Sequence, residues 1–340
     1  MKILIVFTGG TIGSSVKNGI ADIDKGTSNI LLNICSEYNN IDFEYISPFN
    51  ILSENSTCNT LSQICNFMLN IDFSKYTGVI ITHGSDTLAY TSAILGLALS
   101  WVKIPIVVTA ADYVLTSPNS NGTVNFKASV DFISDFANGL HSNGGVFTIW
   151  KNRGEDVKVH ISTRLNEADG FTDSFTSWGG SEFGIIKDGH FIRTDNAVNP
   201  ECTIPCEKTA FLKGKNTAFN NDILLLNSYV GLDFDSISVS GKSAVLLRLY
   251  HSATFCNGGT ETSFLRFADR CIKNGVDVFV YSSKRTEYKY KSAESVGNFD
   301  IVPLYNINTT SAYCKLLLAY SVEDKHRSEI ISDTLFYENL

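Results

Sequence analysis

Short runs of consecutive apolar residues alternate along this chain with longer segments whose apolar residues recur at helical spacing. The apolar runs predict strands at residues 3–7, 79–82, 104–109, 146–150, 223–227, 244–250, 276–281 and 301–305. The helical spacing predicts helices at residues 61–69, 87–102, 123–138, 261–273 and 311–320. Continuous apolar runs are typical of strands that a parallel sheet buries on both faces. This order of elements predicts an α/β fold with a parallel sheet.

Residues 151–222 interrupt this rhythm. The stretch is rich in Gly, Asp, Thr and Lys, and it contains the hairpin-like sequence IIKDGHFI at 185–192. We therefore expect an N-terminal α/β domain over residues 1–205, a linker over 206–222 and a smaller C-terminal α/β domain over 223–340. A length of 340 residues suits two domains of ordinary size.

The composition and net charge of the chain indicate which kinds of molecule it is not expected to bind and where it is expected to reside. The formal net charge is -8 and the chain has no basic run, which disfavours nucleic acid and anionic membranes as partners. No apolar stretch approaches the ~20 residues of a membrane span. The apolar start, MKILIVF, is too short for a secretion signal, so we expect a cytoplasmic protein with reduced cysteines. Its six histidines show no metal-ligand spacing, so neither a metal nor another cofactor is expected.

Polar residues and glycines gather where two predicted strands end. Thr8-Gly9-Gly10-Thr11 follows the first strand, and THGSDT, residues 82–87, follows the second. In parallel sheets, ligands bind beyond the carboxyl ends of the strands. The hydroxyls of Thr11 and Ser85 offer a nucleophile and a group that positions water. Asp86 offers a charge for a substrate amine or a proton relay.

Each of these residues also has a purely structural interpretation. Thr8-Gly9-Gly10-Thr11 suits a tight turn, and Ser or Asp before a helix is a common N-cap. A single His83 is more typical of a structural histidine than of a catalyst. Nucleotide binding is disfavoured, because the first motif lacks the G-x-G-x-x-G spacing. The Gly-Lys-Ser at 241–243 has Ser236 where a phosphate-binding loop needs glycine.

TGGTIG at residues 8–13, together with THGSDT some seventy residues later, resembles the bacterial-type L-asparaginase/glutaminase family. The similarity continues in ILSENST (51–57), PIVVTAA (105–111), KNGVDVFVYSS (273–283) and residues 301–321. It therefore covers nearly the whole chain. It implies an N-terminal α/β domain, a smaller C-terminal α/β domain, and a homodimer or homotetramer in which a neighbouring subunit completes the active site.

The resemblance also implies roles for individual residues. Thr11 would be the nucleophile that attacks a side-chain amide and forms an acyl-enzyme. Ser85 stands where the family usually has Thr, and it keeps the hydroxyl. Asp86 would hold the substrate's amino group and support the second catalytic network. The implied substrate-binding residues are Gly10, Ser53 for the carboxylate, Glu54 near the amine, and Gly84.

Two residues of the family pattern are missing. Residues 12–37 contain no Tyr, although the family has one shortly after its nucleophile. The family's Lys has no clear counterpart within residues 153–171. Lys158 and His251 are possible substitutes, and each is also explained as an ordinary structural or surface residue.

The expected function is an amidohydrolase that converts L-asparagine to aspartate and ammonia through a Thr nucleophile. Its partner would be a small-molecule amide. One alternative is a related amidase with a different amide substrate. Another is a non-catalytic homologue that binds amino acids, since function depends on the site rather than on the fold.

Overall fold

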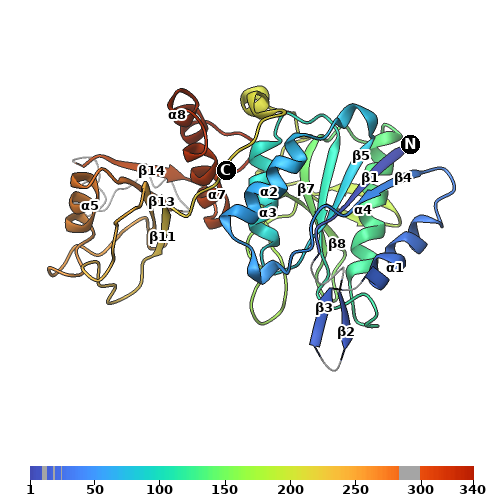
Figure 1. The fold of residues 1–340 in the computed structure, drawn as a ribbon, viewed down its shortest axis with the longest axis horizontal. Coiled ribbons are helices and arrows are strands. Elements are labelled where there is room, and N and C mark those ends of the chain that lie inside the picture. The colour runs from blue at the N-terminus through green and yellow to red at the C-terminus, as the bar shows by residue number, and fades with distance from the viewer. Residues whose placement is uncertain (10–13, 18–19, 24, 283–298) are drawn as a thin grey trace. The chain divides into compact units, whose positions relative to one another are not determined.

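A computed structural model describes residues 1–9, 14–17, 20–23, 25–282 and 299–340. These residues divide into two compact units, and Figure 1 shows the helices and strands of both. Unit 1 comprises Met1–Thr217 and Leu335–Tyr337, and unit 2 comprises Ala218–Thr334 and Glu338–Leu340.

Unit 1 is built on an eight-stranded sheet with the strand order β10-β9-β8-β7-β6-β5-β1-β4. The strands are β1 (Lys2–Phe7), β4 (Asp42–Ile46), β5 (Gly78–Thr82), β6 (Pro105–Thr109), β7 (Gly145–Lys151), β8 (Val157–Ile161), β9 (Gly184–Lys187) and β10 (His190–Arg193). β5 and β6 are buried along their whole length, as their continuous apolar sequences predict.

The sheet is mixed rather than fully parallel. β4, β1, β5, β6 and β7 are parallel neighbours, whereas β8, β9 and β10 are added in antiparallel pairs. The expected hairpin at 185–192 is β9–β10, which turns at Asp188 (φ 52°) and Gly189 (φ 80°). Positive φ at both central residues is the two-residue turn that matches the twist of paired strands. The α/β class with a parallel sheet is confirmed, and β8, β9 and β10 extend that sheet as antiparallel strands.

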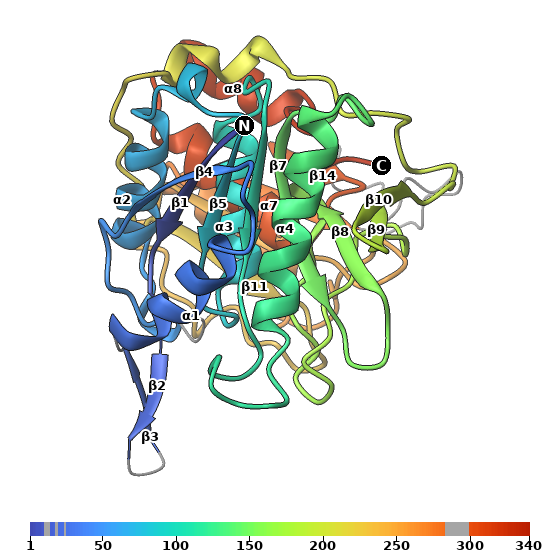
Figure 2. The same ribbon diagram turned by 90° about the vertical axis from the view of Figure 1, so that its right-hand side faces the viewer.

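Helices cover both faces of this sheet. They are α1 (Lys25–Cys35), α2 (Cys58–Leu69), α3 (Leu88–Ala98) and α4 (Gly122–Ala137). On β7, Phe147 packs in a core cluster with Phe126 of α4, while Thr148 donates a hydrogen bond to Ser92 of α3 over 2.9 Å. Because neighbouring strand residues point to opposite faces, α3 and α4 lie on opposite sides of the sheet. Figure 2 shows α4 in front of the strands.

The described residues of unit 1 also form a small hairpin and four short 3₁₀ helices. They are β2 (Ser14–Lys17), β3 (Ile20–Ile23), η2 (Ser53–Asn55), η3 (Phe73–Lys75), η4 (Ser162–Arg164) and η5 (Glu207–Leu212). Phe336, from the C-terminal tail, is buried in the core of this unit. Its ring touches the backbone at Gly145, where a Cβ atom would lie 2.3 Å from the ring.

Unit 2 contains a four-stranded parallel sheet with the order β11-β12-β13-β14. Its elements are β11 (Ile223–Asn227), β12 (Ala244–Arg248), α5 (Phe264–Lys273), β13 (Asp277–Ser282), β14 (Ile301–Tyr305), α7 (Thr309–Tyr320) and α8 (Asp324–Ser332). Apolar residues of the sheet pack with Phe264, Phe267 and Cys271 of α5. Within the described parts of the chain, no helix is long and apolar enough to cross a membrane.

Candidate functional site

The candidate site lies at the carboxyl ends of β1 and β5, which are adjacent and parallel. Phe7 pairs with Thr82 in the sheet, and the polar motifs follow directly. The main-chain N–H and the side-chain hydroxyl of Thr8 both donate to the Thr82 carbonyl, over 3.2 and 2.8 Å. The hydroxyl of Thr8 is therefore structural, and it joins the first motif to the second.

Gly9 brings a third segment to this edge of the sheet. Its φ is 104°, and it forms an isolated parallel bridge with Ile51, whose N–H donates to the Thr8 carbonyl over 2.9 Å. A Cβ atom on Gly9 would lie 2.5 Å from the Ile51 carbonyl oxygen. Only glycine satisfies both the positive φ and this close backbone approach. As a result, residues 51–57 begin beside the exit of β1.

Two of the expected site residues cannot be placed. Gly10 and Thr11 lie outside the described residues, which stop at Gly9 and resume at Ser14. Their roles as substrate-binding residue and nucleophile remain predictions.

The structure does bring Ser53 and Asp86 together. Ser53 Oγ donates a hydrogen bond to Asp86 Oδ2 over 3.0 Å, and Thr87 Oγ1 donates to the Ser53 carbonyl over 3.1 Å. Ser53 is only 3% exposed, whereas Asp86 and the neighbouring Glu54 are exposed. The segment 51–57 and the turn before α3 thus form one hydrogen-bonded arrangement that presents carboxylates at the surface.

Ser85 and Asp86 are not the N-cap of α3. Thr87 occupies the N-cap position and makes no side-chain cap bond, while the Leu88 N–H donates to the Ser85 carbonyl over 3.3 Å. The Ser85 side chain is half-buried, and its hydroxyl has no hydrogen-bond partner in the described part of the chain. The capping interpretation of these two side chains is therefore wrong.

His83, in the turn after β5, and Thr91, on α3, are not among the site residues predicted from the sequence. The ring of His83 is buried, with its two nitrogens 2.8 Å from the Gly84 carbonyl oxygen and 3.0 Å from Thr91 Oγ1. Burial lowers the pKa of His83, although the Gly84 carbonyl and the charge of Asp86 oppose this effect. The lowered pKa favours the neutral form of the ring. Thr91 lies eight residues after His83, on α3, and no sequence motif indicates that their side chains form a hydrogen bond.

Lys158 lies on β8 and is paired with carboxylates. Its Nζ is 2.5 Å from Glu155 and 4.0 Å from Glu182, and the side chain is 21% exposed. It lines a pocket of about 400 Å³ together with His160 and residues 176–182. Among the described residues, no contact joins Lys158 to Ser85 or Asp86.

His251 lies in unit 2, shortly after β12. Its ring is exposed, and Nε2 is 3.1 Å from the hydroxyl of Ser252. The structure therefore shows a surface histidine. A contribution of this residue to the site of a neighbouring protomer stays a prediction.

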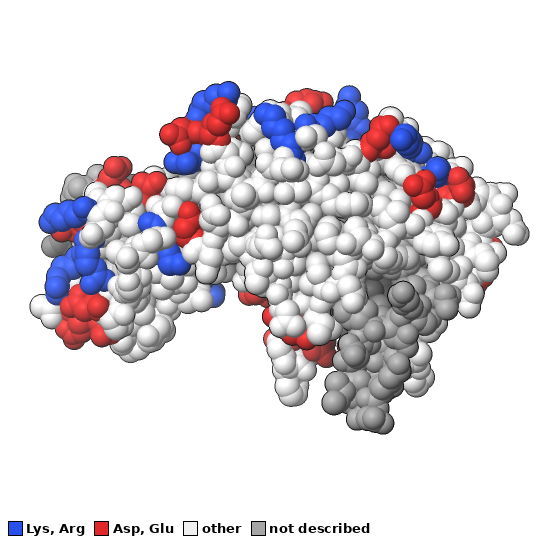
Figure 3. All heavy atoms as spheres, viewed as in Figure 1, with Lys and Arg blue, Asp and Glu red and all other residues white. Residues whose placement is uncertain are grey.

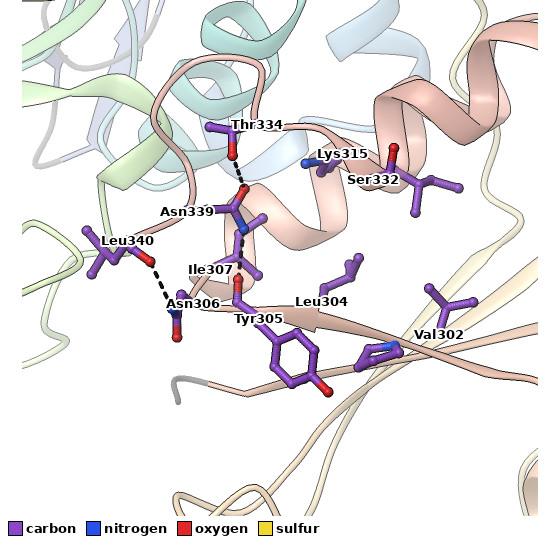
Figure 4. Close-up of a pocket in the computed structure, with 12 residues that line it drawn as sticks. Val302, Leu304, Tyr305, Asn306, Ile307, Lys315, Ser332, Thr334, Asn339 and Leu340 are labelled. Atoms are coloured by element: carbon purple, nitrogen blue, oxygen red, sulfur yellow. Dashed lines mark hydrogen bonds between the residues drawn. The ribbon is translucent and has the colours of Figure 1, made fainter. Parts of the chain in front are cut away.

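Unit 2 has a pocket of its own, of about 490 Å³, beside β14 (Figure 4). In it, Asn339 donates to the Tyr305 carbonyl over 2.8 Å, and Asn306 donates to the Leu340 carbonyl over 2.8 Å. None of the predicted site residues lines this pocket.

No cluster of three or more His, Cys, Asp or Glu suited to a metal ion occurs in the described ranges. On the face drawn in Figure 3, blue and red side chains are mixed in small groups rather than gathered into one basic area.

Comparison with known protein families gives one match over more than half of the chain. Residues 2–195 match the asparaginase family, in the part described as "Asparaginase, N-terminal". This range includes both motifs at the ends of β1 and β5.

Similar sequences carry a different name. A glutamyl-tRNA(Gln) amidotransferase subunit of Methanosphaera stadtmanae is 27% identical over 94% of this chain and 72% of its own length. The subunit with the same name in Metallosphaera sedula is 23% identical over 84% of this chain and 66% of its own length.

Two solved structures share the fold over the full chain. The thermostable L-asparaginase from Thermococcus kodakarensis has a TM-score of 0.77 at 19% identity, covering 100% of this chain and 99% of that one. L-asparaginase I from Vibrio cholerae has a TM-score of 0.74 at 17% identity, with the same coverage.

Proposed function

This chain belongs to the asparaginase family, and we propose that it hydrolyses the side-chain amide of L-asparagine to aspartate and ammonia. The observation that carries the proposal is the Ser53–Asp86 hydrogen bond at the carboxyl end of β5. This hydrogen bond lies beside the end of β1, where Thr8 donates to Thr82 of β5. Thr11 follows Thr8 by three residues in the sequence. A nucleophile, a second hydroxyl and a carboxylate for the substrate's amine would then share one edge of the sheet.

The proposed reaction has two steps, with Thr11 as the nucleophile. Thr11 Oγ1 bonds to the amide carbon and loses its proton, and the carbonyl oxygen becomes an oxyanion. The carbon–nitrogen bond then breaks, ammonia leaves with the proton, and an ester of Thr11 remains. Water adds to this ester, aspartate leaves and the hydroxyl is restored, as in other covalent mechanisms.

Residues around Thr11 have distinct proposed roles. Asp86, held by Ser53, binds the substrate's ammonium group, and Glu54 lies near the same group. The Ser85 hydroxyl positions the water of the second step, and the glycines Gly10 and Gly84 let the substrate approach the backbone. Lys158 and His251 are the candidates for the proton acceptor, a role that typically contributes 10²–10⁴-fold in rate. We also propose a homodimer or homotetramer with a shared site.

The amidotransferase relatives favour a second candidate function. Proteins named as a subunit of such an enzyme are similar over 94% and 84% of this chain. An amidase that acts on another amide, such as glutamine, as one component of a larger enzyme is therefore the alternative. A homologue that binds amino acids without turnover is the third possibility.

Ammonia release from L-asparagine and from L-glutamine tests the proposal. We expect Thr11→Ala to abolish release and Thr11→Ser, which keeps a hydroxyl, to retain part of it. Release at the wild-type rate by Thr11→Ala contradicts a Thr11 nucleophile. Release from glutamine alone selects the second candidate. Thermal stabilisation by amino acids without any turnover selects the binding homologue.

A further inference from the structure

His83 is buried at the start of the turn between β5 and α3, and the proposed reaction does not use it. Its side chain is 1% exposed, and its main-chain N–H donates to the Thr109 carbonyl over 2.8 Å. This bond extends the pairing of β5 and β6 by one residue, so the backbone at His83 is as fixed as the sheet itself. Both nitrogens of the ring also make hydrogen bonds, one with Gly84 and the other with Thr91.

The hydrogen bonds of the ring define which nitrogen carries the proton. Nδ1 is 2.8 Å from the Gly84 carbonyl oxygen, and a carbonyl oxygen only accepts hydrogen bonds. Nδ1 must therefore be the protonated nitrogen. In the neutral ring, Nε2 is then an acceptor, and it takes the hydroxyl proton of Thr91, which is 0% exposed, over 3.0 Å. Burial lowers the pKa of His83 and favours this neutral form.

This arrangement controls the direction of the next peptide group. The C=O and N–H of a trans peptide point in opposite directions, and the described residues contain no cis peptide bond. Because the Gly84 carbonyl points to the buried ring, the Ser85 N–H points away from that ring. That N–H has no acceptor among the described residues.

The hydrogen bond from His83 to the Gly84 carbonyl restricts rotation of the Gly84–Ser85 peptide group. Glycine adopts a wide range of backbone angles, so the Gly84–Ser85 peptide is the part of the turn that rotates most easily. Rotation would point the Ser85 N–H inward, away from a ligand beside Asp86. A donor that stabilises developing charge is effective only when its direction is fixed before the reaction.

We propose that His83, in its Nδ1-protonated form, is a positioning residue that directs the Ser85 N–H at the carbonyl oxygen of the substrate amide. This inference rests on the proposed function. His83 itself does not touch the substrate. It acts through the Gly84 carbonyl, and Thr91 acts through His83 by holding the ring in the required tautomer.

Two substitutions of His83 separate its two hydrogen bonds. In His83→Asn, the amide NH₂ occupies the place of Nδ1 and keeps the donation to Gly84, while the bond to Thr91 is lost. In His83→Gln, the longer side chain reaches the place of Nε2 and keeps the contact with Thr91, while the bond to Gly84 is lost. Both variants keep a polar side chain of similar size in the same buried place, so they are matched controls for folding.

Steady-state ammonia release by these variants tests the proposal. Loss of one oxyanion donor typically lowers kcat by 10²–10³-fold. We therefore expect His83→Gln to lose about 10²-fold in kcat with KM nearly unchanged, and His83→Asn to lose less than about 10-fold. Equal losses in two variants of equal melting temperature overturn the proposal. A larger loss in His83→Asn overturns it too.

Nitrogen-15 NMR of histidine-labelled protein separates this proposal from the proposed function. The ring signals that disappear in His83→Gln belong to His83, and we expect them to show a proton on Nδ1. A proton on Nε2, or on both nitrogens at pH 7, overturns the positioning role even if the protein is active. If the wild type hydrolyses neither amide, the proposed function and the oxyanion role fail together. The tautomer then still shows whether His83 holds the Gly84 carbonyl.

Discussion

Ser53 and Asp86, which are 33 residues apart in the chain, are joined by a hydrogen bond of 3.0 Å from Ser53 Oγ to Asp86 Oδ2. Ser53 is almost completely buried, whereas Asp86 is exposed. A buried hydroxyl therefore holds one oxygen of a surface carboxylate, and the other oxygen has no hydrogen-bond partner among the described residues. The Thr87 hydroxyl strengthens the arrangement by donating to the Ser53 carbonyl. The orientation of Asp86 is thus set by the segment 51–57, which begins beside Gly9.

Removal of this hydrogen bond is expected to weaken substrate binding. Hydrogen bonds to charged groups contribute about 1.5–3 kcal/mol, and 1.4 kcal/mol is tenfold in affinity. We expect Ser53→Ala to raise the KM for the amide about tenfold, with kcat changed less than about threefold. Ser74→Ala is the matched control, because Ser74 donates to Asp72 in an exposed 3₁₀ helix away from the site. A KM in Ser53→Ala equal to that of the control would contradict the role given to Ser53.

Gly9 is expected to tolerate no side chain. In Gly9→Ala, the new Cβ would lie 2.5 Å from the Ile51 carbonyl oxygen at a φ of 104°, and backbone cannot move aside as a flexible side chain would. Overpacking costs about 1–3 kcal/mol and a positive φ about 1–2 kcal/mol, so we expect a loss of about 2–5 kcal/mol in the free energy of unfolding. Gly139→Ala, at a φ of 72° with no atom within 4 Å, isolates the cost of positive φ. Urea unfolding that gives the same loss for both variants would refute the close-approach argument.

Much of the fold follows from the hydrophobic pattern. All eight predicted strands occur with ends shifted by at most two residues, because each is a continuous apolar run in a buried sheet. β4 and β8 were not predicted. β4 reads Asp-Phe-Glu-Tyr-Ile at the edge of the sheet, and β8 carries Lys158 and His160, so neither is a continuous apolar run. Helix α8 was not predicted either, since its sequence, DKHRSEIIS, is mostly polar.

Residues of the candidate site could be predicted only where they belong to a local sequence motif. The two motifs at the strand ends indicated Ser85 and Asp86, and the family resemblance added Ser53. The hydrogen bonds from Thr8 to Thr82 and from Thr91 to His83 depend on tertiary proximity, so no local pattern reveals them. Ser and Asp before a helix suggested capping, but Thr87 takes the cap position, so neither Ser85 nor Asp86 caps α3.

Asp131 on α4 is expected to make stability fall as the pH rises. Burial, and secondarily the charge of Asp135 one turn away, raise the pKa of Asp131 to about 6, while His190 and Lys127 oppose the shift. The unfolded chain has an ordinary aspartate pKa of about 3.9. The folded protein therefore binds this proton more tightly, and the resulting stabilisation is complete below about pH 4 and is lost as the pH rises through 6.

Asp131→Asn is expected to remove this dependence, because an amide stays neutral at every pH. At pH 8 we expect the variant to unfold with a free energy about 1–2 kcal/mol higher than the wild type, and at pH 4 with nearly the same value. Urea unfolding between pH 4 and 8 measures the difference. Asp156→Asn, at an exposed position, is the control. Parallel curves for Asp131→Asn and the wild type would show that Asp131 does not titrate in this range.

Lys315 and Glu338 form a buried ion pair in unit 2, with 2% and 0% of their side chains exposed. Nζ is 2.8 Å from Glu338 Oε1 and 2.5 Å from the Asp333 carbonyl oxygen. Removing the ammonium leaves the Glu338 carboxylate buried and its charge uncompensated by Lys315, which costs about 3–5 kcal/mol, so we expect Lys315→Met to lose that much stability. The double variant Lys315→Met/Glu338→Gln should recover part of the loss, because the buried carboxylate is then replaced by a neutral amide.

An exposed pair of similar length provides the control for this prediction. Lys273 and Asp269 are 2.6 Å apart on the surface of α5, with 71% and 47% of their side chains exposed. Exposed pairs contribute about 0–1 kcal/mol, so Lys273→Met should change the free energy of unfolding by less than about 1 kcal/mol. Chemical denaturation followed by far-UV circular dichroism measures all three variants. If Lys315→Met costs no more than Lys273→Met, or if the double variant is less stable than Lys315→Met alone, the buried pair does not anchor residues 338–340 as the structure implies.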